Sequence, residues 1–120
     1  MLNAIVVGLG GFVGAICRYL IGLIQVNEVT TFPIKTFLIN VIGCIVIGII
    51  TVAATKNSSI NPQLVLFLKV GVCGGFTTFS TFALETADMI KAGNPLMAFI
   101  YVLGSVLIGV GVIFAVEYIS

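Results

Sequence analysis

The chain has 120 residues, of which 60% are hydrophobic and 8% charged, and five Lys and Arg against four Asp and Glu give a net charge of +1. A soluble domain is about a quarter charged because its surface must be solvated, so this composition excludes a water-soluble globular protein, and its hydrophobicity excludes a disordered chain. The sequence contains no His, which removes His-based catalysis and most transition-metal sites, and no basic cluster, which excludes nucleic acid as a partner.

Four stretches are long and apolar enough to cross a lipid bilayer as helices, which takes about 20 mostly apolar residues. The first has no Lys or Arg before its apolar run and is longer than the core of a signal peptide, so we expect it to be retained. The sequence therefore predicts an all-α integral membrane protein, a single four-helix transmembrane domain over residues 1–120. Its helices are expected at about Leu2–Val26, Pro33–Thr55, Leu64–Ala92 and Pro95–Ile119.

The first stretch carries a charged residue, Arg18, well inside the span. Gly10, Gly14, Arg18 and Gly22 recur every fourth residue and so share one helix face. Small residues at this spacing let another helix approach closely, and we expect this face to pack against protein. Arg18 is interpreted either as a structural residue, which snorkels to the end of the span or pairs with a helix C-terminus, or as a direct contact for an ion.

The second stretch contains one amide side chain, Asn40. An amide offers two N–H donors and an acceptor oxygen, so it can serve an anion. An Asn between membrane helices can equally tie the two helices together. The sequence leaves both roles open.

The middle of the third stretch is unusual, because residues 71–82 include three Gly, three Thr, one Ser and three Phe. Gly74-Gly75 beside Thr77-Thr78 makes a poor continuous helix, and we expect a break there. Lipid cannot satisfy the freed backbone groups, so a break must face protein, water or an ion, as in many transporters and channels. The alternative is an unbroken Gly- and Thr-rich packing helix.

Aromatic and polar side chains follow at helical spacing. Phe79, Phe82 and Glu85 are three residues apart on one face, and the positive edge of an aromatic ring can attract an anion. In the fourth stretch Tyr101 and Ser105 lie one turn apart, which would suit the wall of a narrow ion path. These residues form no catalytic constellation, and the protein is not expected to be an enzyme.

The charges that normally set orientation are almost balanced. One side of the membrane would hold Lys56, with Lys69 if it snorkels back, and the other side would hold Lys35 and Lys91. This balance fits either a weak bias completed by the insertion machinery or dual topology, with both orientations made and paired antiparallel.

Three segments together resemble the Fluc (CrcB) family of fluoride channels over the whole chain. They are residues 10–19 (GGFVGAICRY), 40–43 (NVIG) and 74–82 (GGFTTFSTF), of which the last is the most specific. The resemblance implies an antiparallel, dual-topology homodimer in the plasma (inner) membrane that lets fluoride leave the cytoplasm passively through two pathways.

The resemblance also implies roles for individual residues. A central structural sodium ion would be held by backbone carbonyls at Gly74 and Thr77 of both subunits, and no organic cofactor is implied. Gly109 stands where some relatives have a further hydroxyl, which puts the length of the polar track in doubt. Arg18 matches a position that the resemblance assigns to structure or to the vestibule. The residues implied along the fluoride pathways are Asn40, Phe79, Ser80, Thr81, Phe82, Glu85, Tyr101 and Ser105.

Two other functions remain open from the sequence. A proton-coupled small multidrug exporter also has four short helices and dual topology, but it needs a carboxylate in its first helix, where this chain has Arg18 and no acid. A non-transporting assembly subunit would tolerate polar replacements at Phe79 and Phe82.

Overall fold

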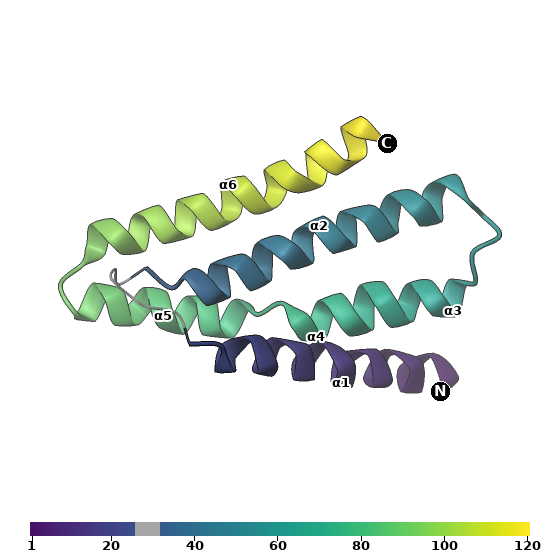
Figure 1. Ribbon diagram of the computed structural model, residues 1–120, viewed down its shortest axis with the longest axis horizontal. Helices are drawn as coiled ribbons and strands as arrows, with labels where there is room; N and C mark the ends of the chain where they lie inside the picture. The colour runs from purple at the N-terminus through teal and green to yellow at the C-terminus, as the bar shows by residue number, and fades with distance from the viewer. Residues whose placement is uncertain (26–31) are drawn as a thin grey trace.

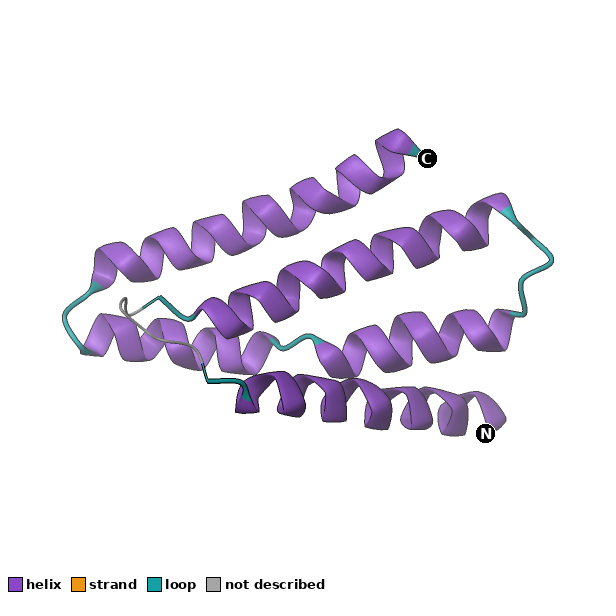
Figure 2. Ribbon diagram, in the orientation of Figure 1, coloured by secondary structure: helices purple, strands orange, loops and turns teal. Residues whose placement is uncertain are grey.

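All described elements of the computed structural model, which describes residues 1–25 and 32–120, are helical (Figure 2). Among the described residues, four helical spans are long and apolar enough to cross a membrane, which confirms the predicted number. They are α1 (Leu2–Leu23), α2 (Ile34–Lys56), a composite third span over Pro62–Lys91, and α6 (Pro95–Ile119).

The third span is built from four short helical pieces. These are α3 (Pro62–Val65), the π-helix η1 (Leu66–Cys73), α4 (Gly74–Phe76) and α5 (Phe79–Lys91). Between α4 and α5 the backbone is extended, at Thr77 (φ −82°, ψ 160°) and Thr78 (φ −147°, ψ 119°). Gly74 and Gly75 remain helical, so the change of conformation is confined to the two β-branched residues.

The spans lie side by side in the order α6, α2, third span, α1 (Figure 1). The α1 helix and the third span run in the same direction, while α2 and α6 run the opposite way. The two termini and the 57–61 connection therefore share one end of the bundle, and the 92–94 connection lies at the other. Beyond the interruption, α5 packs against α6 and α2.

Glycines bring α1 into close contact with η1 and α4. A Cβ added at Gly10 would contact the Phe67 carbonyl oxygen, and one at Gly14 would contact the Val72 carbonyl oxygen and lie 2.7 Å from the Phe76 amide nitrogen. Only glycine permits such an approach of two backbones. On the predicted packing face of α1, these close glycine contacts do not extend to Gly22. Gly22 is exposed, and a Cβ at Gly22 would meet nothing within 4 Å.

The end of α1 differs from its expected position. The sequence predicts a helix to Val26, which lies outside the described residues, but α1 ends at Leu23 and Ile24 is already extended (φ −66°, ψ 126°). The polar Gln25 follows directly, so the apolar pattern gives no support for further helix.

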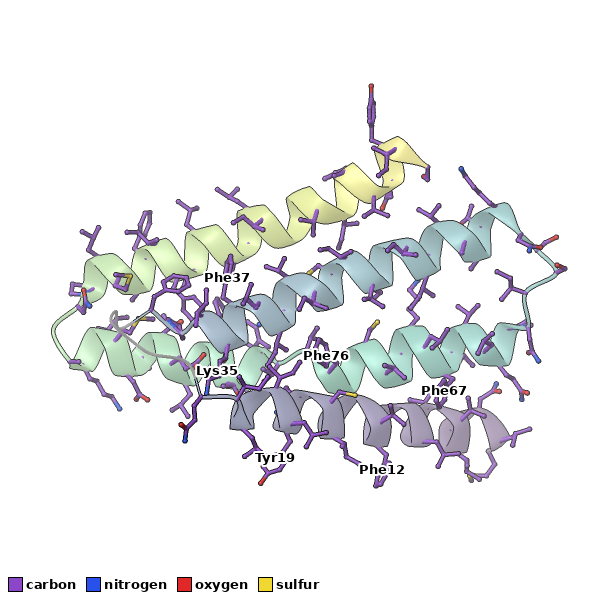
Figure 3. The ribbon with its side chains drawn as sticks, in the orientation of Figure 1. Phe12, Tyr19, Lys35, Phe37, Phe67 and Phe76 are labelled. Atoms are coloured by element: carbon purple, nitrogen blue, oxygen red, sulfur yellow. The ribbon has the colours of Figure 1, made fainter. Side chains whose placement is uncertain are left out.

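Much of the apolar surface of the single chain is uncovered. The buried core cluster consists of Met89, Ala98 and Tyr101, whereas large side chains such as Phe12 (66% exposed) and Tyr19 (65% exposed) point away from the other helices (Figure 3). This is the expected distribution for a bundle whose outer solvent is lipid.

Candidate functional site

Asn40 on α2 joins its helix to the extended segment of the third span. Its Nδ2 donates to the Thr78 carbonyl oxygen at 3.1 Å, and its Oδ1 accepts from the Thr78 N–H at 2.9 Å. One side chain thus satisfies both backbone groups of a residue outside any helix, where lipid could satisfy neither. An amide has a second N–H, so this bridge leaves Asn40 one donor for a ligand.

Hydroxyl groups in and next to the extended segment at Thr77 and Thr78 form hydrogen bonds that end α4 and begin α5. Thr78 is the N-cap residue, and its Oγ1 accepts from the Thr81 N–H at 3.2 Å. Ser80 is exposed, with its Oγ 3.5 Å from the same Thr78 oxygen. Thr77 closes the preceding helix, because its hydroxyl donates to the Cys73 carbonyl oxygen at 2.9 Å.

These hydrogen bonds change the environment of two backbone carbonyls. In a continuous helix the Gly74 carbonyl would accept from the Thr78 N–H, and the Thr77 carbonyl from the Thr81 N–H. Here the Thr78 N–H is donated to Asn40 and the Thr81 N–H to the Thr78 hydroxyl. Both carbonyl oxygens thereby lose their helical partner, and oxygen donors of this kind suit a hard cation.

A groove of about 640 Å³ brings several of the predicted residues together. Phe79 is 77% exposed, and its ring centroid lies 5.9 Å from that of Phe82. Across the groove Ser105 on α6 has a buried hydroxyl oxygen with no hydrogen-bond partner among the described residues. The predicted site residues that line this groove are Asn40, Gly74, Thr77, Phe79, Phe82 and Ser105, and Thr78, which was not predicted as a site residue, lines it with them.

A second cavity, of about 420 Å³, lies on the other side of Thr78, which lines both. It gathers Arg18 from α1 with Thr81 and Glu85 from the third span. Arg18 Nε donates to the Gly75 carbonyl oxygen at 3.3 Å, in the last turn before α4 ends at Phe76. This contact is the pairing with a helix C-terminus that the sequence left as one of its interpretations.

Glu85 holds three spans together. Its Oε2 accepts from the Thr36 hydroxyl of α2 at 3.0 Å, and its Oε1 accepts from the Tyr101 hydroxyl of α6 at 2.8 Å. Tyr101 is fully buried, at 0% exposure, and its ring lies 4.9 Å from that of Phe82 between centroids. Tyr101 therefore lies behind the aromatic pair and lines neither of these two cavities.

The sequence did not predict Thr78, which lines both cavities, or Thr36 as site residues. Thr36 is the residue that donates to Glu85. It is buried, and it lies one helical turn before Asn40 on the same face of α2. The same four-residue spacing drew attention to Tyr101 and Ser105 on α6, so the signal was present in the sequence.

Comparison with known proteins places these residues in a family. Residues 5–116 match the family described as CrcB-like protein, Camphor Resistance (CrcB). The chain is 41% identical over 115 residues to a protein of Chlorobaculum tepidum named fluoride-specific ion channel FluC, covering 96% of this chain and 91% of that relative. Proteins of the same name from Ruminiclostridium cellulolyticum (43% over 108 residues, 88% and 82% of the two chains) and Oceanobacillus iheyensis (40% over 111 residues, 92% and 85%) are similar to it as well.

Proposed function

Because the chain belongs to the CrcB-like protein family, we propose that it is a fluoride-specific ion channel that lets fluoride leave the cytoplasm passively. It is a channel and not an enzyme, and a multi-pass protein of the membrane, which in a bacterium is the plasma membrane. Among the structural features, the groove carries this proposal. It gathers an amide, hydroxyls and two aromatic rings beside an interrupted membrane helix.

The proposed pathway consists of weak donors. Phe79 and Phe82 offer ring edges, Asn40 its remaining N–H, and Ser105 a hydroxyl without a partner among the described residues. Conduction needs sites that are favourable enough to enter and weak enough to leave. Ser80, Thr81, Glu85 and Tyr101 extend the polar surroundings, with Tyr101 acting through Glu85 and Phe82.

We further propose an antiparallel homodimer in which a second copy closes the groove, giving two pathways. In the single chain Phe79 is 77% exposed and Gly74 is also exposed, although both lie in the middle of the third span. The near-even Lys distribution supports insertion in both orientations.

Dual topology makes its own prediction. Ser58→Lys with Ser59→Lys should fix one orientation, and Asp88→Lys with Ala92→Lys the other, since these pairs lie at opposite ends of the bundle. Each charge variant expressed alone should lose fluoride resistance in cells, and coexpression of the two should restore it. Full resistance from one fixed orientation alone would refute the antiparallel arrangement.

A structural sodium ion is proposed at the centre of this dimer. The carbonyl oxygens of Gly74 and Thr77 fit such an ion, because the N–H groups that would bond them in a helix are donated elsewhere. When bound, the ion would supply a fixed positive field near the groove and would hold the third spans of two subunits together.

Exchange of the aromatic rings tests the pathway. Phe79→Ile and Phe82→Ile keep an apolar side chain but remove the ring edge, and we expect each to lower fluoride efflux from liposomes by at least about tenfold. Phe12→Ile is the matched control for Phe79→Ile, since Phe12, like Phe79, is exposed in the single chain but points away from the other helices (Figure 3).

Size-exclusion chromatography should show all three variants folded and eluting like the wild type. Normal efflux through both Phe79→Ile and Phe82→Ile would exclude a ring-edge role and would favour a packing role for the aromatic pair.

A further inference from the structure

Lys69 is a charged side chain in the same groove as the proposed fluoride pathway. It lies in η1, is half-buried, and lines the groove together with Gly74, Phe79 and Ser105. Within the described part of the chain it has no ion pair and no hydrogen bond. An unpaired charge within a membrane span is costly and marks a functional position unless it snorkels to the surface.

The position of Lys69 along the span puts it near one mouth of the groove. The third span has 30 residues and is about 45 Å long at 1.5 Å per residue, against a hydrocarbon core of about 30 Å. At the same rise per residue, Lys69 lies about 10 Å along the helix axis from Pro62, the first residue of the span. Its backbone is therefore close to the boundary of the core, at the end of the bundle that carries the 57–61 connection.

The surroundings leave the Lys69 charge uncompensated. No other residue that lines the groove within the described chain is charged, and most of the lining is apolar. A cleft with one sign of charge and walls of low dielectric constant raises the local concentration of the opposite ion. A partly hydrated ammonium on a flexible stem at the mouth attracts an anion without forming a tight site deeper in the path.

We propose that Lys69 is an electrostatic entrance residue that concentrates fluoride at this mouth of the pathway and repels cations. The inference rests on the proposed fluoride channel and adds a residue that sets the rate of entry. The deeper donors, Asn40 and Ser105, then receive an ion that has already been enriched at the mouth.

The test measures the initial rate of fluoride efflux from neutral phosphatidylcholine liposomes at low and high ionic strength. Lys69→Gln and Lys69→Met are compared with Lys69→Arg, which keeps the charge. Lys56→Gln is the matched control, because Lys56 lies at the same end of the bundle and its loss changes the orienting charge of that end equally. An impermeant salt sets the ionic strength.

At about 10 mM salt we expect Lys69→Gln and Lys69→Met to lower the rate by about three- to tenfold, and at about 0.5 M by less than about twofold, because salt screens the charge. Lys69→Arg and Lys56→Gln should stay within about twofold of the wild type at both salt concentrations.

Three results would overturn the role of Lys69 while the wild type conducts. They are an unchanged rate in both neutral variants at low salt, an equal loss at both ionic strengths in variants that elute as folded protein, and a loss that appears only with anionic lipid. The second would indicate a structural role and the third an anchor to lipid headgroups. A wild type that releases no fluoride would instead contradict the proposed channel itself.

Discussion

At the scale of single residues, the contact between Asn40 and Thr78 determines how the third span can be interrupted within a membrane. Two hydrogen bonds from one amide replace the helical partners of both Thr78 backbone groups. From the sequence, the Asn40 amide could either tie two helices together or bind an ion. The geometry shows that it ties α2 to the third span, and one N–H remains for an ion. The two residues are 38 positions apart, so no local pattern could have paired them.

Removal of the Asn40 amide should therefore destabilise the folded protein and also lower the rate of fluoride efflux. Asn40→Ala leaves the Thr78 N–H and carbonyl without partners away from water, at a cost of about 1–3 kcal/mol for each group. We expect a lower melting temperature in detergent and reduced fluoride efflux. Asn57→Ala is the control, because Asn57 bonds only to the exposed Ser59 among the side-chain contacts described. An unchanged melting temperature of Asn40→Ala would contradict the bridging role.

At the scale of elements, the packing of α1 against the third span depends on glycines. The sequence predicted these glycines, but only some of them make the close contact. The four-residue spacing predicted a packing face on α1, and Gly10 and Gly14 do meet η1 and α4 at backbone distance. At Gly22, one residue before α1 ends, a Cβ would meet nothing within 4 Å, and this glycine lines the second cavity in place of a close helix contact. Periodicity indicates a face, but it cannot show how far a neighbouring helix follows it.

A pair of alanine substitutions on α1 tests this contact. Gly14→Ala places a methyl group against the Val72 carbonyl and should cost about 1–3 kcal/mol by overpacking. Gly8→Ala, where a Cβ meets nothing within 4 Å, should be neutral or stabilising by about 0.5–1 kcal/mol from helix propensity. Thermal unfolding in detergent measures both changes. Equal melting temperatures for the two variants would contradict the close packing of α1 on the third span.

The number and approximate positions of the membrane helices could be predicted because apolar length is a property of each segment alone. The π-helix over Leu66–Cys73 could not, since its residues, apolar apart from Lys69, show no pattern that separates a π-helix from an α-helix. Thr36 was missed although its spacing from Asn40 was visible, because a buried Thr becomes informative only when its partner Glu85, 49 residues away, is known.

At the scale of the whole molecule, the proposed dimer requires that the pathway residues of one chain lie on an open face. The groove is open along the face that carries Phe79, and the aromatic, amide and hydroxyl groups converge on it from α2, the third span and α6. The second cavity adds Arg18, Thr81 and Glu85 on the other side of Thr78. A second copy placed against this face would enclose the groove and would bring two sets of Gly74 and Thr77 carbonyls together.

The central claim, that this protein is a fluoride-specific channel, is tested most directly by ion efflux from liposomes that contain the purified wild-type protein. Fluoride-loaded and chloride-loaded liposomes are followed in parallel with ion-selective electrodes, with protein-free liposomes as the baseline. We expect rapid release of fluoride and chloride release at the baseline, because the similar proteins are named fluoride-specific ion channels. Baseline release of both ions from a protein that elutes as a folded dimer, or equal release of the two ions, would contradict the account.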